Sequence, residues 1–180
     1  MKINKLVIAV GVGLVMASGS ALALPGADSG HGTVTFTGTI IDAPCSIAPD
    51  SIDQTVSLGQ ISNKVLEGGG KSTPVPFQIK LEDCNVESLT DKTVTTTFDG
   101  TPAGSATDLF AIAGTASGAG VAVTADDGVP VTLGEAASTT GIMSGDNELN
   151  FAAYLTALDA SSAIVPGDFT SVANFTLAYN

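Results

Sequence analysis

Apolar and polar residues alternate with a period of two along most of the chain, which is the pattern of β-strands. The alternation predicts strands at 54–61, 75–81, 93–98, 120–125, 129–133, 149–155 and 169–179. Glycine, proline, asparagine and aspartate gather between these stretches, as at 67–70, 99–100, 126–128, 144–147 and 166–167, and mark turns. No sustained stretch has helical spacing. Many short strands with such turns predict an all-β fold, a β-sandwich of Greek-key type.

The amino-terminal residues depart from this pattern. Lys2 and Lys5 precede an apolar run, broken by Gly11 and Gly13, that ends in small residues up to Ala23, which is the composition of a secretory signal peptide. The run is shorter than the ~20 apolar residues that a bilayer requires. We therefore expect a signal peptide at 1–23, an extension at 24–41 and a single folded body at 42–180.

The extension contains one strand-like stretch with an irregularity. Val34, Phe36 and Ile40 alternate with threonines, and Gly38 stands where the alternation requires another apolar side chain. This stretch could be the first strand of its own sheet with Gly38 at a bulge. A glycine within a strand also fits a place where another backbone or side chain comes close.

Charge excludes one class of partner. With 44% hydrophobic and 13% charged residues, the chain has the composition of a folded protein. Removal of the predicted signal peptide leaves four lysines against 18 acidic residues, a net charge of −14, and the chain contains no arginine. A chain of this kind lacks the groups that neutralise phosphates, so nucleic acid is not an expected partner.

The residues that carry chemistry are sparse. Cys45 and Cys84 are the two cysteines, and their separation predicts a structural disulfide, because it is unlike the C-x-x-C motif of redox sites. The single histidine, His31, lies in the extension, where no fold would hold it as a catalytic base. Asp126-Asp127 is interpreted as a turn, and 146–148 lacks the spacing of a calcium loop. We expect no catalytic site, no metal and no cofactor, and hence not an enzyme.

The carboxyl-terminal stretch predicts a last strand that lacks one neighbour. Ala173, Phe175, Leu177 and Tyr179 share one face of the last predicted strand, and no further strand follows. The triplet at 174–176 matches a glycosylation acceptor but falls inside this strand, so we treat it as chance. A central last strand without a neighbour leaves unpaired backbone groups and an apolar furrow.

Taken in order, several segments resemble the subunits of bacterial chaperone-usher pili, especially the major rod pilins of the type 1 and P pilus kind. The resemblance covers essentially the whole chain and rests on residues 32–47, 53–62, 76–84, 147–155 and 166–180.

The resemblance implies an incomplete immunoglobulin-like sandwich that lacks its last strand, with an N-terminal donor-strand extension that fills the groove of the next subunit. Val34, Phe36 and Ile40 would then fill pockets, and Gly38 would lie where the groove leaves no room.

The family's chaperone-binding motif is a penultimate aromatic residue and a glycine fourteenth from the end, which Tyr179 and Gly167 match. The acceptor groove and chaperone-binding strand would comprise Gly167, Ala173, Phe175, Leu177, Tyr179 and Asn180. Tyr179 as a half-buried edge aromatic and Gly167 as a turn glycine are compatible with these roles.

The function implied is that of a structural subunit that polymerises by donor-strand exchange into the rod of a surface pilus, or fimbria. The expected partners are neighbouring copies of the chain, a periplasmic chaperone, an outer-membrane usher and other pilus subunits. The alternatives are a minor adaptor subunit and a tip adhesin that binds a host glycan or protein.

Overall fold

The computed structural model describes residues 30–180, so the predicted signal peptide lies outside the described residues. The chain divides into two units, residues 1–40 and 41–180. In the first unit, residues 30–40 belong to no helix or strand and are exposed. In the second unit, the only helices are two single turns, α1 (Pro49–Ile52) and α2 (Asn63–Leu66).

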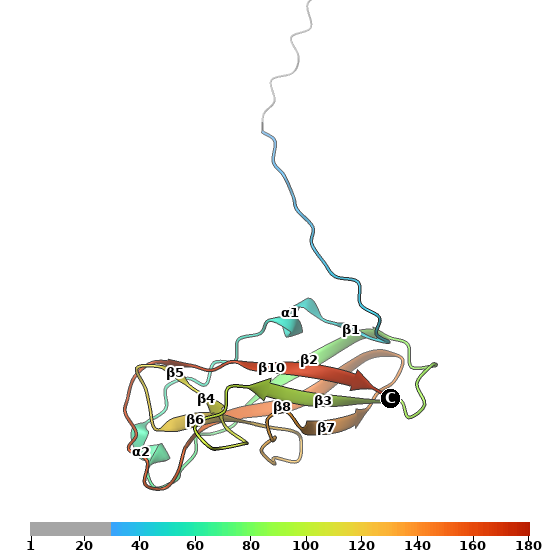
Figure 1. Ribbon diagram of the computed structural model, residues 1–180. Helices are drawn as coiled ribbons and strands as arrows, with labels where there is room; N and C mark the ends of the chain where they lie inside the picture. The colour runs from blue at the N-terminus through green and yellow to red at the C-terminus, as the bar shows by residue number, and fades with distance from the viewer. Residues whose placement is uncertain (1–29) are drawn as a thin grey trace, which may run out of the picture. The chain divides into compact units, whose positions relative to one another are not determined.

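The second unit is a sandwich of antiparallel sheets (Figure 1). The larger sheet has the strand order β1-β2-β8-β6-β4 and the smaller sheet the order β10-β3-β7. The strands of the larger sheet are β1 (Ser46–Ile47), β2 (Val75–Cys84), β8 (Gly145–Ala157), β6 (Ala119–Thr124) and β4 (Phe110–Ala111). Those of the smaller sheet are β10 (Ala173–Tyr179), β3 (Thr93–Gly100) and β7 (Ala136–Gly141). A separate ribbon pairs β5 (Ala113–Gly114) with β9 (Phe169–Thr170).

The core lies between the two sheets and follows the predicted alternation. On β3, Val94, Thr96 and Phe98 are buried and point inward, while the residues between them face outward. Phe98 packs edge-on against Phe151 of β8, with ring centroids 4.9 Å apart, and lies 6.4 Å from Phe77 of β2. Because aromatic rings bury large areas, this cluster is a substantial apolar contact between the sheets.

The predicted disulfide is confirmed. Cys45 and Cys84 are bonded and buried, and they attach the start of the second unit to the end of β2. Asp83 has a φ of 53°, and the register of β2 with β8 shifts between Leu81 and Cys84. This bulge lets Cys84 face inward three residues after Leu81, where simple alternation would turn it outward.

Three strand predictions were wrong. Residues 129–133 form no strand, because their backbone groups bond to separate segments: Val131 N–H donates to the carbonyl of Val123, and Leu133 N–H to that of Thr107. Residues 169–179 are not one strand, because the chain is interrupted at 171–172 and continues in a different sheet. Residues 54–61 are also outside any strand, and this has consequences for the site below.

Candidate functional site

A groove of about 860 Å³ opens between two segments that are distant in sequence. Residues 54–61 line one side, and residues 164–173 with Phe175 line the other. Apolar side chains from both sheets form its floor, including Phe77, Phe98, Phe110, Val121, Val123, Ala153 and Leu155. A long cleft with apolar walls is suited to an extended apolar segment.

The first side of the groove, residues 54–61, is called the groove wall below. It makes no backbone–backbone hydrogen bond within the described part of the chain. Its one hydrogen bond to the rest of the body joins the side-chain amide of Gln54 to the carbonyl oxygen of Gln78, at 3.1 Å. Val56 and Leu58 are half-buried, and Thr55 and Ser57 between them are exposed. The groove wall therefore has the alternation of a strand without a partner strand.

The second side of the groove is the free edge of β10. β10 pairs with β3 over its whole length and has no other strand partner among the described residues. The amide and carbonyl of Asn180 bond to those of Thr93, so the alternate residues Ala178, Thr176 and Asn174 also bond toward β3. The backbone groups of Phe175, Leu177 and Tyr179 consequently point away from β3, toward the free edge of β10. Each presents one donor and one acceptor for an added strand.

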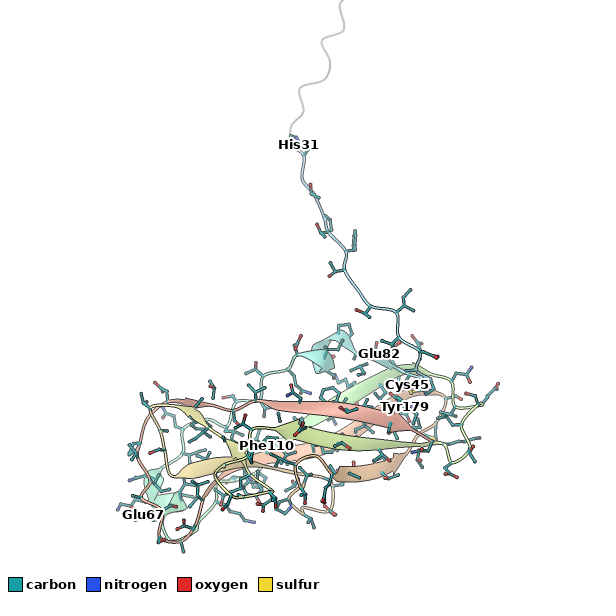
Figure 2. All side chains as sticks on the ribbon, viewed as in Figure 1. His31, Cys45, Glu67, Glu82, Phe110 and Tyr179 are labelled. Carbon is teal, nitrogen blue, oxygen red and sulfur yellow. A yellow bond between two sulfur atoms is a disulfide. The ribbon has the colours of Figure 1, made fainter. Side chains whose placement is uncertain are left out.

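The site residues expected in the carboxyl-terminal stretch differ in whether they line the groove. Gly167, Ala173 and Phe175 line the groove, whereas Leu177, Tyr179 and Asn180 do not. Leu177 and Tyr179 are half-buried on the same inner face as Phe175 (Figure 2 labels Tyr179). Burial raises the pKa of the Tyr179 hydroxyl above its ordinary value.

Position 167 has no room for a side chain. A Cβ atom at this position would lie 2.4 Å from the Thr115 hydroxyl and 2.7 Å from the backbone nitrogen of Ala116. Asp168 N–H donates to the Thr115 hydroxyl at 3.0 Å, and Thr115 N–H donates to the carbonyl of Asp168 at 3.0 Å. The φ of Gly167 is not in the left-handed region, so the close approach of residues 115–116 explains this glycine.

The expected donor residues are exposed in the first unit. The exposed fractions of the Val34, Phe36 and Ile40 side chains are 74%, 90% and 102%. A Cβ atom at Gly38 would meet nothing within 4 Å in the chain itself. His31 is exposed as well.

The remaining polar candidates have structural roles. Asp127 accepts a hydrogen bond from Val129 N–H and closes a turn at Gly128, whose φ is 74°. Asn147 bonds to both backbone groups of Met143 and braces the turn between β7 and β8. The residues that the structure describes include no group of three potential metal ligands. None of their helices is long and apolar enough to cross a bilayer.

Sequence reasoning missed part of this site. It did not assign a role to the groove wall or to Val165 and Val172, which line the opposite side with exposed fractions of 47% and 71%. The signal at 54–61 was its strand-like alternation, which does not indicate whether a partner strand exists.

Comparison with known proteins places this groove in context. The sequence model described as "Fimbrial protein" matches residues 34–180. The Fimbria A protein of Serratia marcescens is 54% identical over 99% of both chains, and the major MR/P fimbria protein of Proteus mirabilis is 50% identical, also over 99% of both. Among solved structures, a chain of a chaperone-usher pilus superposes with a TM-score of 0.76 at 32% identity, over 84% of this chain and 97% of that one. The P pilus rod subunit PapA gives a TM-score of 0.69 at 30% identity, over 77% of this chain and all of that one.

Proposed function

Since the chain belongs to the fimbrial protein family and is a structural subunit of a surface pilus, we propose that copies join when the extension of one fills the groove of the next. The observation that carries this proposal is the groove between the groove wall and β10, two segments with strand-like alternation and no strand between them. No similarity found favours the tip-adhesin alternative.

The dimensions of the two parts agree. The groove wall has eight residues and β10 has seven, so each spans about 23–26 Å at ~3.3 Å per residue. Residues 33–41 of the extension would span about 30 Å as a strand. One strand of this length covers the groove from end to end.

The proposed register divides the extension into two faces. Val34, Phe36 and Ile40 point into the groove, and Gly38 passes where its walls approach. Burying these three side chains, which are exposed in the free chain, contributes roughly 5–9 kcal/mol. The backbone groups of Phe175, Leu177 and Tyr179 add hydrogen bonds worth about 1 kcal/mol each. Leu177 and Tyr179 thus act through their backbones, although their side chains do not line the groove.

Before assembly, a strand of a periplasmic chaperone occupies the same edge of β10, and an outer-membrane usher exchanges it for the extension. Support for this step comes from Tyr179 and Gly167, which match the family's carboxyl-terminal motif. Other pilus subunits would join through the same groove.

Thermal unfolding of residues 42–180 with a synthetic peptide of residues 31–42 tests the proposal. We expect a large, slowly reversing rise in Tm. A peptide with Gly38→Leu should lose this effect, because its side chain meets the groove. The matched Thr37→Leu peptide, altered on the opposite face, should keep it. A body whose Tm is indifferent to the unaltered peptide would refute strand addition.

A further inference from the structure

Two exposed apolar side chains flank the two parts that strand exchange would join. Ile41 follows the last apolar residue of the extension, and its side chain is 55% exposed. Val172 directly precedes β10 at the border of the groove, and its side chain is 71% exposed. Neither belongs to the hydrophobic clusters that the described residues form. Single exposed apolar residues are common on protein surfaces, so their position relative to one another decides whether they form a contact.

The direction of the inserted extension decides which end of the groove Ile41 reaches. Every strand pair that the structure describes is antiparallel. Antiparallel pairing is also slightly more stable per residue than parallel pairing. An extension that runs antiparallel to β10 has its last residues at the end of the groove where β10 begins. Ile41 then lies at the same end as Val172.

The sizes of the inward side chains select one register. Residues directly opposite each other in an antiparallel pair share a face, so the inward positions 34, 36, 38 and 40 must meet the inward positions 173, 175, 177 and 179. Ile40 opposite Ala173 uses all four positions of both strands. The same register sets Gly38 opposite Phe175, so the position without a side chain meets an aromatic ring that lines the groove. A shift of two residues in one direction would crowd Ile40 against Phe175, and a shift in the other would leave a void between Gly38 and Ala173.

In this register Ile41 is directly opposite Val172, and both side chains point to the outer face. The carbonyl oxygen of Val172 lies on the β3 side, 2.9 Å from the position that a Cβ atom on Gly100 would occupy. The backbone of Val172 thus points toward β3, as that of Asn174 does, and not toward the inserted strand. Ile41 and Val172 would therefore form a non-hydrogen-bonded pair, in which the Cα atoms are about 4.5 Å apart and the side chains come closest.

We propose that Ile41 of one copy packs on Val172 of the copy that receives its extension, and that this contact covers the entrance of the groove. The inference rests on the proposed strand exchange. It gives both exposed side chains the same partner surface, a second copy of the chain.

The rest of the outer face shows why the entrance differs. In this register the other outward pairs contain only short or polar side chains: Thr39 with Asn174, Thr37 with Thr176, and Thr35 with Ala178. The large apolar pair lies where the extension leaves the groove, which is a place where water can reach the first backbone hydrogen bonds of the joint. A cross-strand pair on one face typically changes an equilibrium by a factor of roughly 1.5–5. The contact therefore sets how long a joint lasts, and the groove itself decides whether the joint forms.

The test uses the full-length chain, secreted with its assembly proteins and recovered as sheared fibres. Ile41→Cys combined with Val172→Cys places two thiols opposite each other at every joint, where mild oxidation can link them. The matched control combines Ile41→Cys with Thr176→Cys, which faces the same side about 13 Å further along β10. Non-reducing gels of fully denatured fibres measure covalent links between copies, and a ladder of unheated SDS-resistant polymers measures strand exchange.

We expect the Ile41→Cys, Val172→Cys fibres to give a ladder of covalent multimers that dithiothreitol removes, whereas the control pair gives monomers. Monomers from both pairs, or equal cross-linking in both, would overturn the contact but leave strand exchange intact as long as the unheated ladder persists. A missing unheated ladder in the unaltered chain would overturn both proposals.

A charge exchange decides the question if the added cysteines disturb pairing of Cys45 with Cys84. Ile41→Lys and Val172→Glu should each speed the dissociation of formed fibres in guanidinium by about 2–5-fold, because each sets a charge against an apolar side chain. The double variant should return to the rate of the unaltered chain, because the two charges then lie opposite each other. Ile41→Lys with Thr176→Glu, the matched control, should stay fast. Equal rates for the two double variants would overturn the contact.

Discussion

Replacement of Thr96 by valine should stabilise the subunit. Thr96 lies on β3 between the sheets, its side chain is fully buried, and its hydroxyl has no hydrogen-bond partner in the described structure. Its register neighbours are Leu177 of β10 and Ser138 of β7. A strand added to the far edge of β10 would not reach this hydroxyl, so the penalty persists in the fibre.

The magnitude follows from the cost of the orphaned group. A buried polar group without a partner costs about 1–3 kcal/mol, and a methyl group in its place removes that cost with little change of shape. We expect Thr96→Val to raise the free energy of unfolding by about 1–2 kcal/mol. At a urea dependence of about 2 kcal/mol per M, the midpoint should rise by roughly 0.5–1 M.

The assay is urea unfolding of the monomer, followed by circular dichroism. Thr95→Val is the matched control, because Thr95 precedes Thr96 on the same strand but faces outward and shares its hydroxyl with Thr139. It should change stability by less than about 0.5 kcal/mol. An unchanged or lower midpoint for Thr96→Val would refute the reasoning. An equal gain in both variants would attribute the effect to the strand propensity of valine instead of burial.

Three further predictions concern the rest of the body. Gly167→Ala should lower stability by about 1–3 kcal/mol, because its Cβ would clash with neighbouring backbone atoms, whereas Gly141→Ala, with open space, should be near neutral in the same urea assay. Reduction of the disulfide, which closes a separation of 39 residues, should cost about 4 kcal/mol, and a urea midpoint unaffected by dithiothreitol would contradict this. Burial raises the pKa of the Tyr154 and Tyr179 hydroxyls above that of a free tyrosine, about 10. The stability that this shift contributes to the folded chain is therefore fully present below pH ~10 and is lost as the pH rises through the raised pKa values. Tyrosinate absorbance in the folded chain should accordingly appear above pH ~10, and a transition at or below that pH would contradict the burial.

Local patterns predicted much of the fold. Alternation at 93–98 and 149–155 corresponds to β3 and β8, and Phe98 and Phe151 face the core as the period of two requires. The pairing of the two cysteines needed no structure. The same local rule failed at 129–133, where alternating side chains enter the core but the backbone meets several segments in turn.

The site was only partly predictable. The extension and the last strand were predicted as parts of the site from their apolar faces, and the family followed from the order of the motifs. The role of residues 54–61 was not identified, because alternation reveals which face of a segment is apolar and nothing about its neighbour. Gly167 was assigned to the family's carboxyl-terminal motif, and a turn glycine was compatible with that role; nothing in the sequence indicated that residues 115–116 leave no room for a side chain there.

By itself, the sequence determined the all-β class, the disulfide, the two faces of each strand and the resemblance to pilus subunits, because these depend on residues close together or on ordered motifs. Only the tertiary structure decided that 54–61 and β10, more than a hundred residues apart in the chain, border one groove with no strand between them. It also decided which backbone groups of β10 point away from β3 and stay without a strand partner. Those features depend on which segments become neighbours, and the free energy that selects neighbours comes from packing across the whole core.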